Sequence, residues 1–140
     1  MSLEENKAII RRFVEEVQSK HDVDLMDELF SPDFYDHGRL STTHTLEESK
    51  RFFTMSFVAF PDLRADIHDQ VAEGDKVVTR KTFHGTHQGE FMGVPPTGKK
   101  VSFDVIDIFR VVDGRISEHW FEGDMMGLMQ QLGALPTPEK

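Results

Sequence analysis

Hydrophobic residues recur at helical spacing along the first 60 positions of the chain. This spacing predicts three helices, over residues 2–19, 24–30 and 45–59. Two capping boxes mark where the first and the third helix begin, Ser2–Glu5 and Thr45–Glu48. The first part of the chain is therefore expected to be mostly helical.

After residue 60 the hydrophobic period changes to two, which is the spacing of strands. The alternating stretches cover residues 64–72, 76–84, 100–111 and 115–122. A last helix is expected over residues 125–132, capped by Asp124 and ended by Gly133, before a loose tail at about 134–140. Helices followed by a run of strands indicate one α+β domain over residues 1–140, with helices on one face of an antiparallel sheet.

Composition excludes several classes of protein. The chain has 140 residues, a net charge of −9 and no cysteine, so disulfides, thiolate metal sites and cysteine nucleophiles are ruled out. The acidic balance argues against a nucleic-acid partner, and no apolar run is long enough to span a membrane. No secretory signal is visible in the first twelve residues. A cytoplasmic protein that acts on small molecules or on proteins is expected.

The last hairpin brings candidate chemistry together. The segment 111–115 (VVDGR) resembles a three-residue loop with its glycine in the left-handed conformation. That loop would place Asp107 opposite His119 and Val105 opposite Phe121, whereas a two-residue turn would shift the register by one. The three-residue version gives one apolar face shared by Phe103, Val105, Asp107, Phe109, His119 and Phe121.

A carboxylate beside an imidazole in apolar surroundings is a plausible acid/base unit. Asp107 would raise the pKa of His119 and orient one ring nitrogen. The pair could then abstract a proton next to a carbonyl or activate a water molecule. A structural ion pair that closes a polar end of the core is the equally good alternative.

Two further polar positions are candidates. His37 follows the second helix and is a better second acid/base group than its neighbour Asp36, which suits a turn. Arg80 lies in the middle of an alternating stretch and could hold an oxyanion, although such an arginine is more often solvated. His84 and His87, with His68, invite a metal site, but the spacing matches no metal motif and we expect none.

The opposite face of the hairpin is also apolar. It would carry Ile106, Ile108, Ile116 and Trp120. An apolar strip on an outer sheet face suggests a partner surface, for which a homodimer is the simplest use. Alternatively, the strip is thin enough to be merely exposed.

Three segments resemble the SnoaL-like polyketide cyclase family of the nuclear-transport-factor-2-like superfamily. They are residues 6–13 (NKAIIRRF), 85–98 (GTHQGEFMGVPPTG) and 108–133 (IFRVVDGRISEHWFEGDMMGLMQQLG). The resemblance implies a cone-shaped α+β fold in which a curved sheet wraps the helices around a deep, mostly apolar pocket, usually in a dimer. It also implies intramolecular aldol closure of a hydrophobic ester without metal or cofactor.

The family's acid and histidine correspond here to Phe121 and Asp107. We therefore expect Asp107 and His119 to act as base and partner, with His37 assisting. The pocket would be shaped by four phenylalanines, Phe34, Phe103, Phe109 and Phe121. The alternatives are a non-catalytic protein that binds a small apolar molecule, or a related isomerase or hydrolase.

Overall fold

The computed structural model describes residues 2–38 and 44–136. The expected tail at 134–140 lies outside the described residues from position 137 onward. None of the described helices is long and apolar enough to cross a membrane.

The predicted helices form, with one change of geometry. The first divides into an α-helix, α1 (Leu3–Arg12), and a π-helix, η1 (Phe13–Ser19). The other segments before residue 60 are η2 (Val23–Leu25), α2 (Met26–Leu29) and α3 (Leu46–Ala59). Both capping boxes are present, which confirms where α1 and α3 begin.

Five strands form one sheet in the order β1-β5-β4-β3-β2. Their bounds are β1 (Phe30–Asp36), β2 (Arg64–Glu73), β3 (Lys76–Thr86), β4 (Lys100–Val112) and β5 (Arg115–Gly123). The last helix is α4 (Met125–Gln131). The sheet is mixed rather than wholly antiparallel, because β1 pairs with β5 in the parallel direction.

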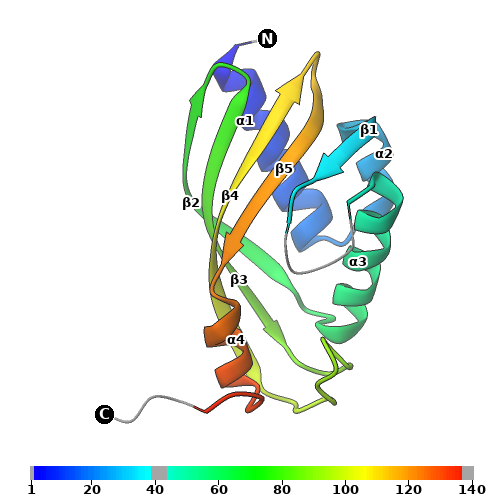
Figure 1. Cartoon of the computed structure of the whole chain (residues 1–140), viewed down its shortest axis with the longest axis vertical. Coiled ribbons are helices and arrows are strands. Elements are labelled where there is room, and N and C mark those ends of the chain that lie inside the picture. Colours follow the sequence, from blue (N-terminus) through cyan, green and yellow to red (C-terminus); the bar gives the residue numbers. More distant parts are fainter. Residues whose placement is uncertain (1, 39–43, 137–140) are drawn as a thin grey trace.

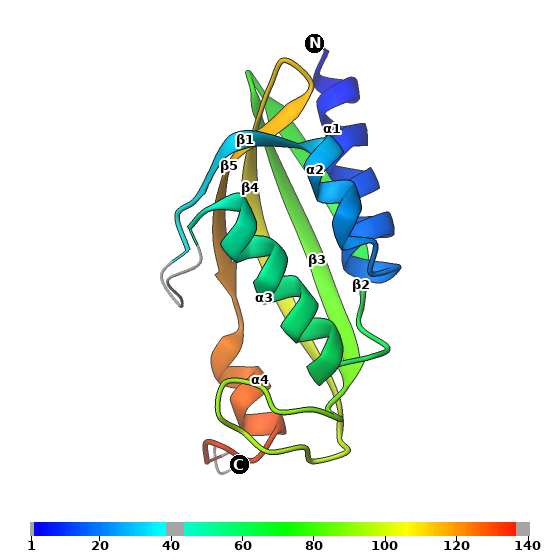
Figure 2. The same cartoon turned by 90° about the vertical axis from the view of Figure 1, so that its right-hand side faces the viewer.

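The sheet is curved, and α1 and α3 lie over the same side of it (Figures 1 and 2). One core cluster lies beneath α1 and η1, where the ring of Phe13 makes edge contacts with Phe30, Phe53 and Phe109. A second cluster lies where the end of α3 meets α4, around Phe60 and Leu128. The α+β class is thereby confirmed, with the helices gathered on one face.

The long loop after β3 is tied to the C-terminal end of α3. The backbone N–H groups of Gln88 and Gly89 both donate to the carbonyl of Ala59, at 2.9 and 3.1 Å. A Cβ on Gly89 would lie 2.7 Å from the carbonyl oxygen of Val58, so this close approach requires glycine. The loop is thus ordered by backbone contacts with α3.

The β4–β5 hairpin differs from the sequence prediction. Val112 pairs with Arg115, so the turn has two residues, Asp113 and Gly114, both with positive φ. A β-bulge follows, and it brings Asp107 opposite Phe121 instead of His119. Beyond the bulge the predicted register was therefore wrong by two residues, and a shift of two keeps the side chains of that part of the hairpin on their predicted faces.

The bulge also changes the place of Ile116. This residue was expected on the outer face, and it is instead fully buried in the first core cluster. The extra residue of a bulge reverses the side-chain alternation of its strand. Ile116 and His119 consequently both point inward, although they are three positions apart.

Candidate functional site

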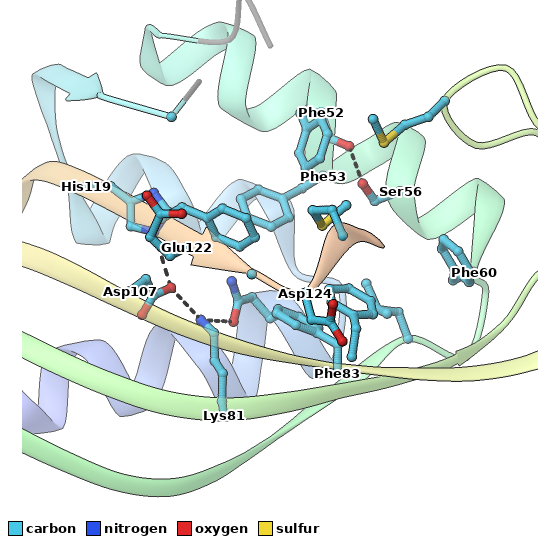
Figure 3. Close-up of a pocket in the computed structure, with 18 of the residues that line it drawn as sticks. Phe52, Phe53, Ser56, Phe60, Lys81, Phe83, Asp107, His119, Glu122 and Asp124 are labelled. Carbon is cyan, nitrogen blue, oxygen red and sulfur yellow. Dashed lines mark hydrogen bonds and ion pairs between the residues drawn. The ribbon is translucent and has the colours of Figure 1, made fainter. Parts of the chain in front are cut away.

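A cavity of about 570 Å³ opens between the sheet, α3, α4 and the loop after β3. Its largest lining side chains are aromatic or thioether groups: Phe52, Phe53, Phe60, Phe83, Phe91, Phe103, Phe121, Met92, Met125 and Met126. Figure 3 shows Lys81, Asp107 and His119 at one end of this cavity, with the labelled phenylalanine rings to one side of them. Such a wall suits a large, flat, apolar ligand that carries few polar groups.

Five polar side chains from five elements meet at one part of this cavity. The Nζ of Lys81 on β3 lies 2.9 Å from Oδ2 of Asp107 on β4 and 2.9 Å from Oε1 of Gln18 on η1. His119 on β5 lies between two carboxylates, with its Nε2 3.2 Å from Oδ2 of Asp107 and its Nδ1 3.1 Å from Oδ2 of Asp36 on β1. The result is one continuous chain of polar contacts.

The ion pair of Lys81 and Asp107 is almost inaccessible to water, with side chains 0% and 1% exposed. Burial acts to raise the pKa of Asp107, but the charge of Lys81 and the contacts with His119 outweigh it and hold that pKa below its usual range. The ammonium also lies over the rings of Phe83 and Phe109, at 5.3 and 5.7 Å. Both ions are therefore compensated within the core.

The two carboxylates fix the protonation of His119. An ionised carboxylate only accepts hydrogen bonds, so a ring nitrogen that faces one must carry a proton. Both nitrogens of His119 face carboxylates, which makes the ring an imidazolium. Burial acts to lower the pKa of His119, while the contacts with Asp107 and Asp36 raise it above its ordinary value. The stabilisation from this raised pKa is complete below about pH 6.5 and is lost as the pH rises through the folded-state value.

These charges cancel within the group. Lys81 and His119 supply two positive charges, and Asp107 and Asp36 supply two negative ones. A neutral cluster costs far less to hold in an apolar cavity than any of its members alone. The members differ in access: the side chains of His119 and Asp36 are 14% and 18% exposed, and they form the more accessible end of the group.

The structure brings together four of the predicted site residues. Asp107, His119, Phe103 and Phe121 all line the cavity. Phe109 stacks on the ring of His119 with centroids 4.4 Å apart, so it supports the site from behind.

Phe34 does not reach the cavity wall. Its side chain is buried in the first core cluster and packs edge-on against Phe30, with ring centroids 4.7 Å apart. It belongs to the hydrophobic core that underlies β1.

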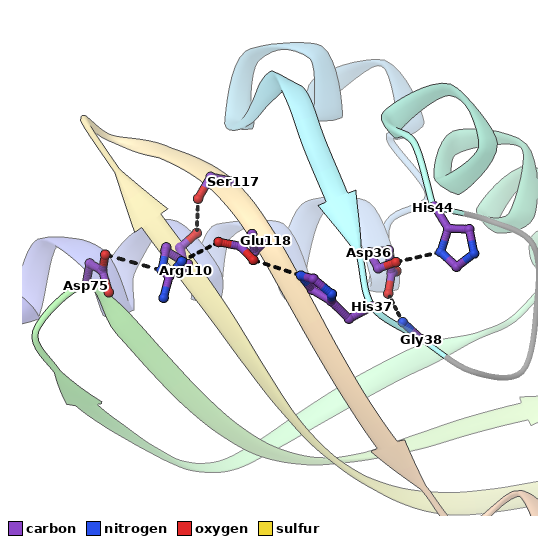
Figure 4. Close-up of polar contacts among 8 residues, drawn as sticks. All are labelled: Asp36, His37, Gly38, His44, Asp75, Arg110, Ser117 and Glu118. Carbon is purple, nitrogen blue, oxygen red and sulfur yellow. Dashed lines mark hydrogen bonds and ion pairs between the residues drawn. The ribbon is translucent and has the colours of Figure 1, made fainter.

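His37 lies away from the cavity. Its Nε2 is 2.7 Å from Oε2 of Glu118, and its ring stacks on Trp120. The hydrogen bond from His37 lowers the pKa of Glu118, which is also paired with Arg110 (Figure 4). Neighbouring side chains of a strand point to opposite faces, so only one of Asp36 and His37 can reach His119, and it is Asp36.

Arg80 is separated from the cavity by the same rule. Its guanidinium is half exposed and pairs with Asp69 at 3.0 Å, while its neighbour Lys81 points inward. Arg80 is therefore a solvated strand residue, which was the alternative considered from the sequence, and it is not placed to hold an oxyanion in the cavity.

Sequence reasoning missed Lys81 and Gln18. Lys81 did carry a signal. In the alternating stretch it falls on the same face as Val77 and Phe83, and a lysine on a core face needs a partner. Gln18 carried a similar signal, because it follows Val14 by four residues and so falls on the apolar face of the first helix, where a polar side chain needs a partner.

The histidines considered for a metal have separate partners. His84 pairs with Asp66, His68 contacts Thr82, and the buried His87 accepts from the backbone of Thr97. Among the described residues, no three His, Asp or Glu side chains are placed to bind one ion.

Replacing Lys81 tests the importance of charge balance. In Lys81→Met the buried carboxylate of Asp107 loses its counter-ion, and we expect the free energy of unfolding to fall by about 3–5 kcal/mol. Lys100→Met, which changes an exposed lysine, should stay within about 0.5 kcal/mol of the parent. Urea unfolding at neutral pH measures both. Equal stabilities of the two variants would show that the ion pair is dispensable.

Comparison with known proteins gives a consistent result. The family model described as SnoaL-like polyketide cyclase matches residues 8–132. Aklanonic acid methyl ester cyclase DnrD of Streptomyces peucetius is 39% identical over 67 residues, which are 47% of this chain and 46% of that protein. This match therefore spans about half the length of that relative.

Two other relatives match along nearly the whole chain. Aklanonic acid methyl ester cyclase AcmA of Streptomyces galilaeus is 29% identical over 140 residues, with 98% of this chain and 96% of that protein covered. The crystal structure of AclR from the same species, described as a candidate hydroxylase, superposes with a TM-score of 0.88 at 34% identity. It covers 99% of this chain and 91% of that one.

Proposed function

The chain belongs to the SnoaL-like polyketide cyclase family, and we propose that it closes a ring in a hydrophobic carbonyl compound by cofactor-free acid/base chemistry. The substrate class is a polyketide-type ester, and the reaction is an intramolecular aldol addition. One observation carries the proposal: an imidazolium and a carboxylate, held by a buried ion pair, face a mostly apolar cavity. An apolar wall binds the ring system, and the polar end acts on its carbonyl groups.

The reaction needs one proton taken and one proton given. A base removes a proton from the carbon beside the ester carbonyl, and the resulting enolate attacks a second carbonyl within the same molecule. One carbon–carbon bond forms, and the new alkoxide takes up a proton. The product is an isomer of the substrate, so no oxidant, reductant or co-substrate is required.

We assign the proton transfers to Asp36 and His119. Asp36 is the more accessible carboxylate and is the base, and His119 supplies positive charge and a proton to the developing oxygen anion. Asp107 was the base expected from the sequence. Its side chain is 1% exposed and is held by Lys81 and His119, so we assign it the positioning of the imidazolium.

This assignment accommodates the departure from the family pattern. The resemblance places an acid at the position of Phe121 on β5, and this chain has a phenyl ring in the cavity wall there. Asp36 supplies a carboxylate to the same cavity from the neighbouring strand β1, which pairs with β5 at His119. The carboxylate and the imidazole of this chain therefore both come from positions other than those that the resemblance implies.

Two other functions make different predictions. The phenyl ring of Phe121 favours a protein that binds an apolar metabolite without changing it. The likeness to AclR favours a hydroxylase, whose product would carry one more oxygen atom. The mass of the product separates all three, because a cyclase leaves it unchanged and a binding protein gives no product.

Asp36→Asn tests the proposal directly. We expect kcat on aklanonic acid methyl ester to fall by about 10²–10⁴-fold, because the amide cannot accept the carbon proton. The matched control His37→Gln alters the next residue, which lies outside the cavity, and should keep nearly full activity. Chromatography with mass detection measures the isomeric product. Full activity of Asp36→Asn would refute the assignment, and a parent protein that binds the ester without product would favour the binding protein.

The outer face of the sheet supports a homodimer as part of this proposal. Ile106 is 50% exposed there, and Ile108 and Trp120 are half-buried. A second copy would cover this strip without closing the cavity, which opens on the other face. A cytoplasmic location stays a prediction from the sequence.

Ile106→Glu tests the dimer. Burying a glutamate in a symmetric interface is unfavourable, so the variant should sediment as a monomer at concentrations where the parent sediments as a dimer. Glu substitution at Val58, which is 69% exposed on α3 at the other side of the sheet, is the control and should leave the mass unchanged. A monomeric parent would rule the interface out.

A further inference from the structure

Ser49 on α3 has a hydroxyl group that finds no partner among the described residues. The residue is 4% exposed and lines the cavity. Its Oγ is buried and makes no hydrogen bond with any residue in the part of the chain that the structure describes. Buried polar groups are almost always paired, so this one needs an explanation.

Two neighbours on the same helix show the usual solution. The hydroxyl of Thr54 donates to the carbonyl of Lys50 at 2.9 Å, and that of Ser56 donates to the carbonyl of Phe52 at 2.8 Å. Hydroxyl groups in helices commonly bond to the carbonyl four residues earlier in this way. Ser49 makes no such bond to Thr45. Its Oγ is buried in this rotamer, and a rotation about χ1 would turn the hydroxyl to the cavity that the residue lines.

Backbone contacts place Ser49 at the reactive end of the cavity. The N–H of Asp36 donates to the carbonyl of His44 at 2.8 Å, which joins the end of β1 to the start of α3. Ser49 follows one turn later, with its N–H on the carbonyl of Thr45 at 2.9 Å. Ser56 also lines the cavity, but it lies about 10 Å further along the helix axis, toward Phe60.

We propose that the Ser49 hydroxyl donates a hydrogen bond to the substrate carbonyl oxygen on which negative charge develops during ring closure. This inference rests on the proposed function and adds a second donor to it. The oxygen would lie between His119 on the sheet and Ser49 on α3. The site near Asp36 is rich in carboxylate, so an oxygen anion there needs donors on more than one side. The substrate must accordingly present a carbonyl group to α3.

The first test compares two hydroxyl residues of one helix. Ser49→Ala should lower kcat on aklanonic acid methyl ester by roughly 10–100-fold with little change in KM, because the bond strengthens as charge develops. It should not lower Tm, since it removes an unpaired buried hydroxyl and adds a better helix former. Thr54→Ala, which changes an exposed residue with a paired hydroxyl outside the cavity lining, should keep the parent's kcat. A kcat unchanged in Ser49→Ala would overturn the proposal.

A binding test separates this inference from the reaction itself. Fluorenone and fluorene have nearly the same shape and differ by one carbonyl oxygen. Calorimetry should show that the parent prefers fluorenone by roughly tenfold, the value of one hydrogen bond, and that Ser49→Ala loses this preference while Thr54→Ala keeps it. A parent without the preference, or a Ser49→Ala variant that retains it, would contradict the proposal.

The two tests fail independently. If the parent forms no cyclised product but Ser49→Ala loses the preference for fluorenone, the proposed reaction is wrong and Ser49 still binds carbonyl groups. If the parent cyclises the ester and Ser49→Ala does so equally fast, the reaction stands and the role of Ser49 is refuted.

Discussion

The structure depends on keeping four charged groups neutral as a set beside an apolar cavity. Lys81 and Asp107 are held out of water, where neither ion would be tolerated alone. Asp107 can serve Lys81 and His119 together, and Asp36 balances the second positive charge. The protonated state of His119 is thus a property of the whole sheet, because each of these side chains comes from a different strand.

In the proposed mechanism one pair of charged groups transfers protons and the other pair holds the first in place. The inner pair is inaccessible and fixes the imidazole from one side, while the stacked ring of Phe109 fixes its plane. The outer pair reaches the cavity and can exchange protons with a bound molecule. A weak carboxylate base gains from this arrangement, since the neighbouring positive charge stabilises the anion formed when the substrate loses its proton.

Much of the fold could be predicted because it follows from local rules. The capping boxes at Ser2 and Thr45 and the change of period near residue 60 are properties of short segments, and they mark elements that the structure contains. The hairpin register was wrong, yet Asp107 and His119 still face the same side, because the turn and the bulge each shift the alternation by one. The turn length and the bulge each shift the register by one residue, so the prediction that Asp107 and His119 share a face is still correct.

The remaining parts of the site required the three-dimensional arrangement. The choice between Asp36 and His37 depends on how β1 docks beside β5, which no pattern within β1 reveals. The contact of Gln18 with Lys81 depends on how η1 docks against β3, two elements that lie far apart in the sequence. Lys81 could have been identified from the sequence, because it is a charged residue on the same strand face as the apolar Val77.

The protonation of His119 is the most direct test of this account. Nitrogen-15 NMR of the histidine rings at neutral pH reports the state of each ring nitrogen separately. The account predicts that both nitrogens of His119 carry protons, and that this state persists above the pH at which an ordinary histidine is neutral. A neutral ring with one bare nitrogen facing Asp107 or Asp36 would contradict it.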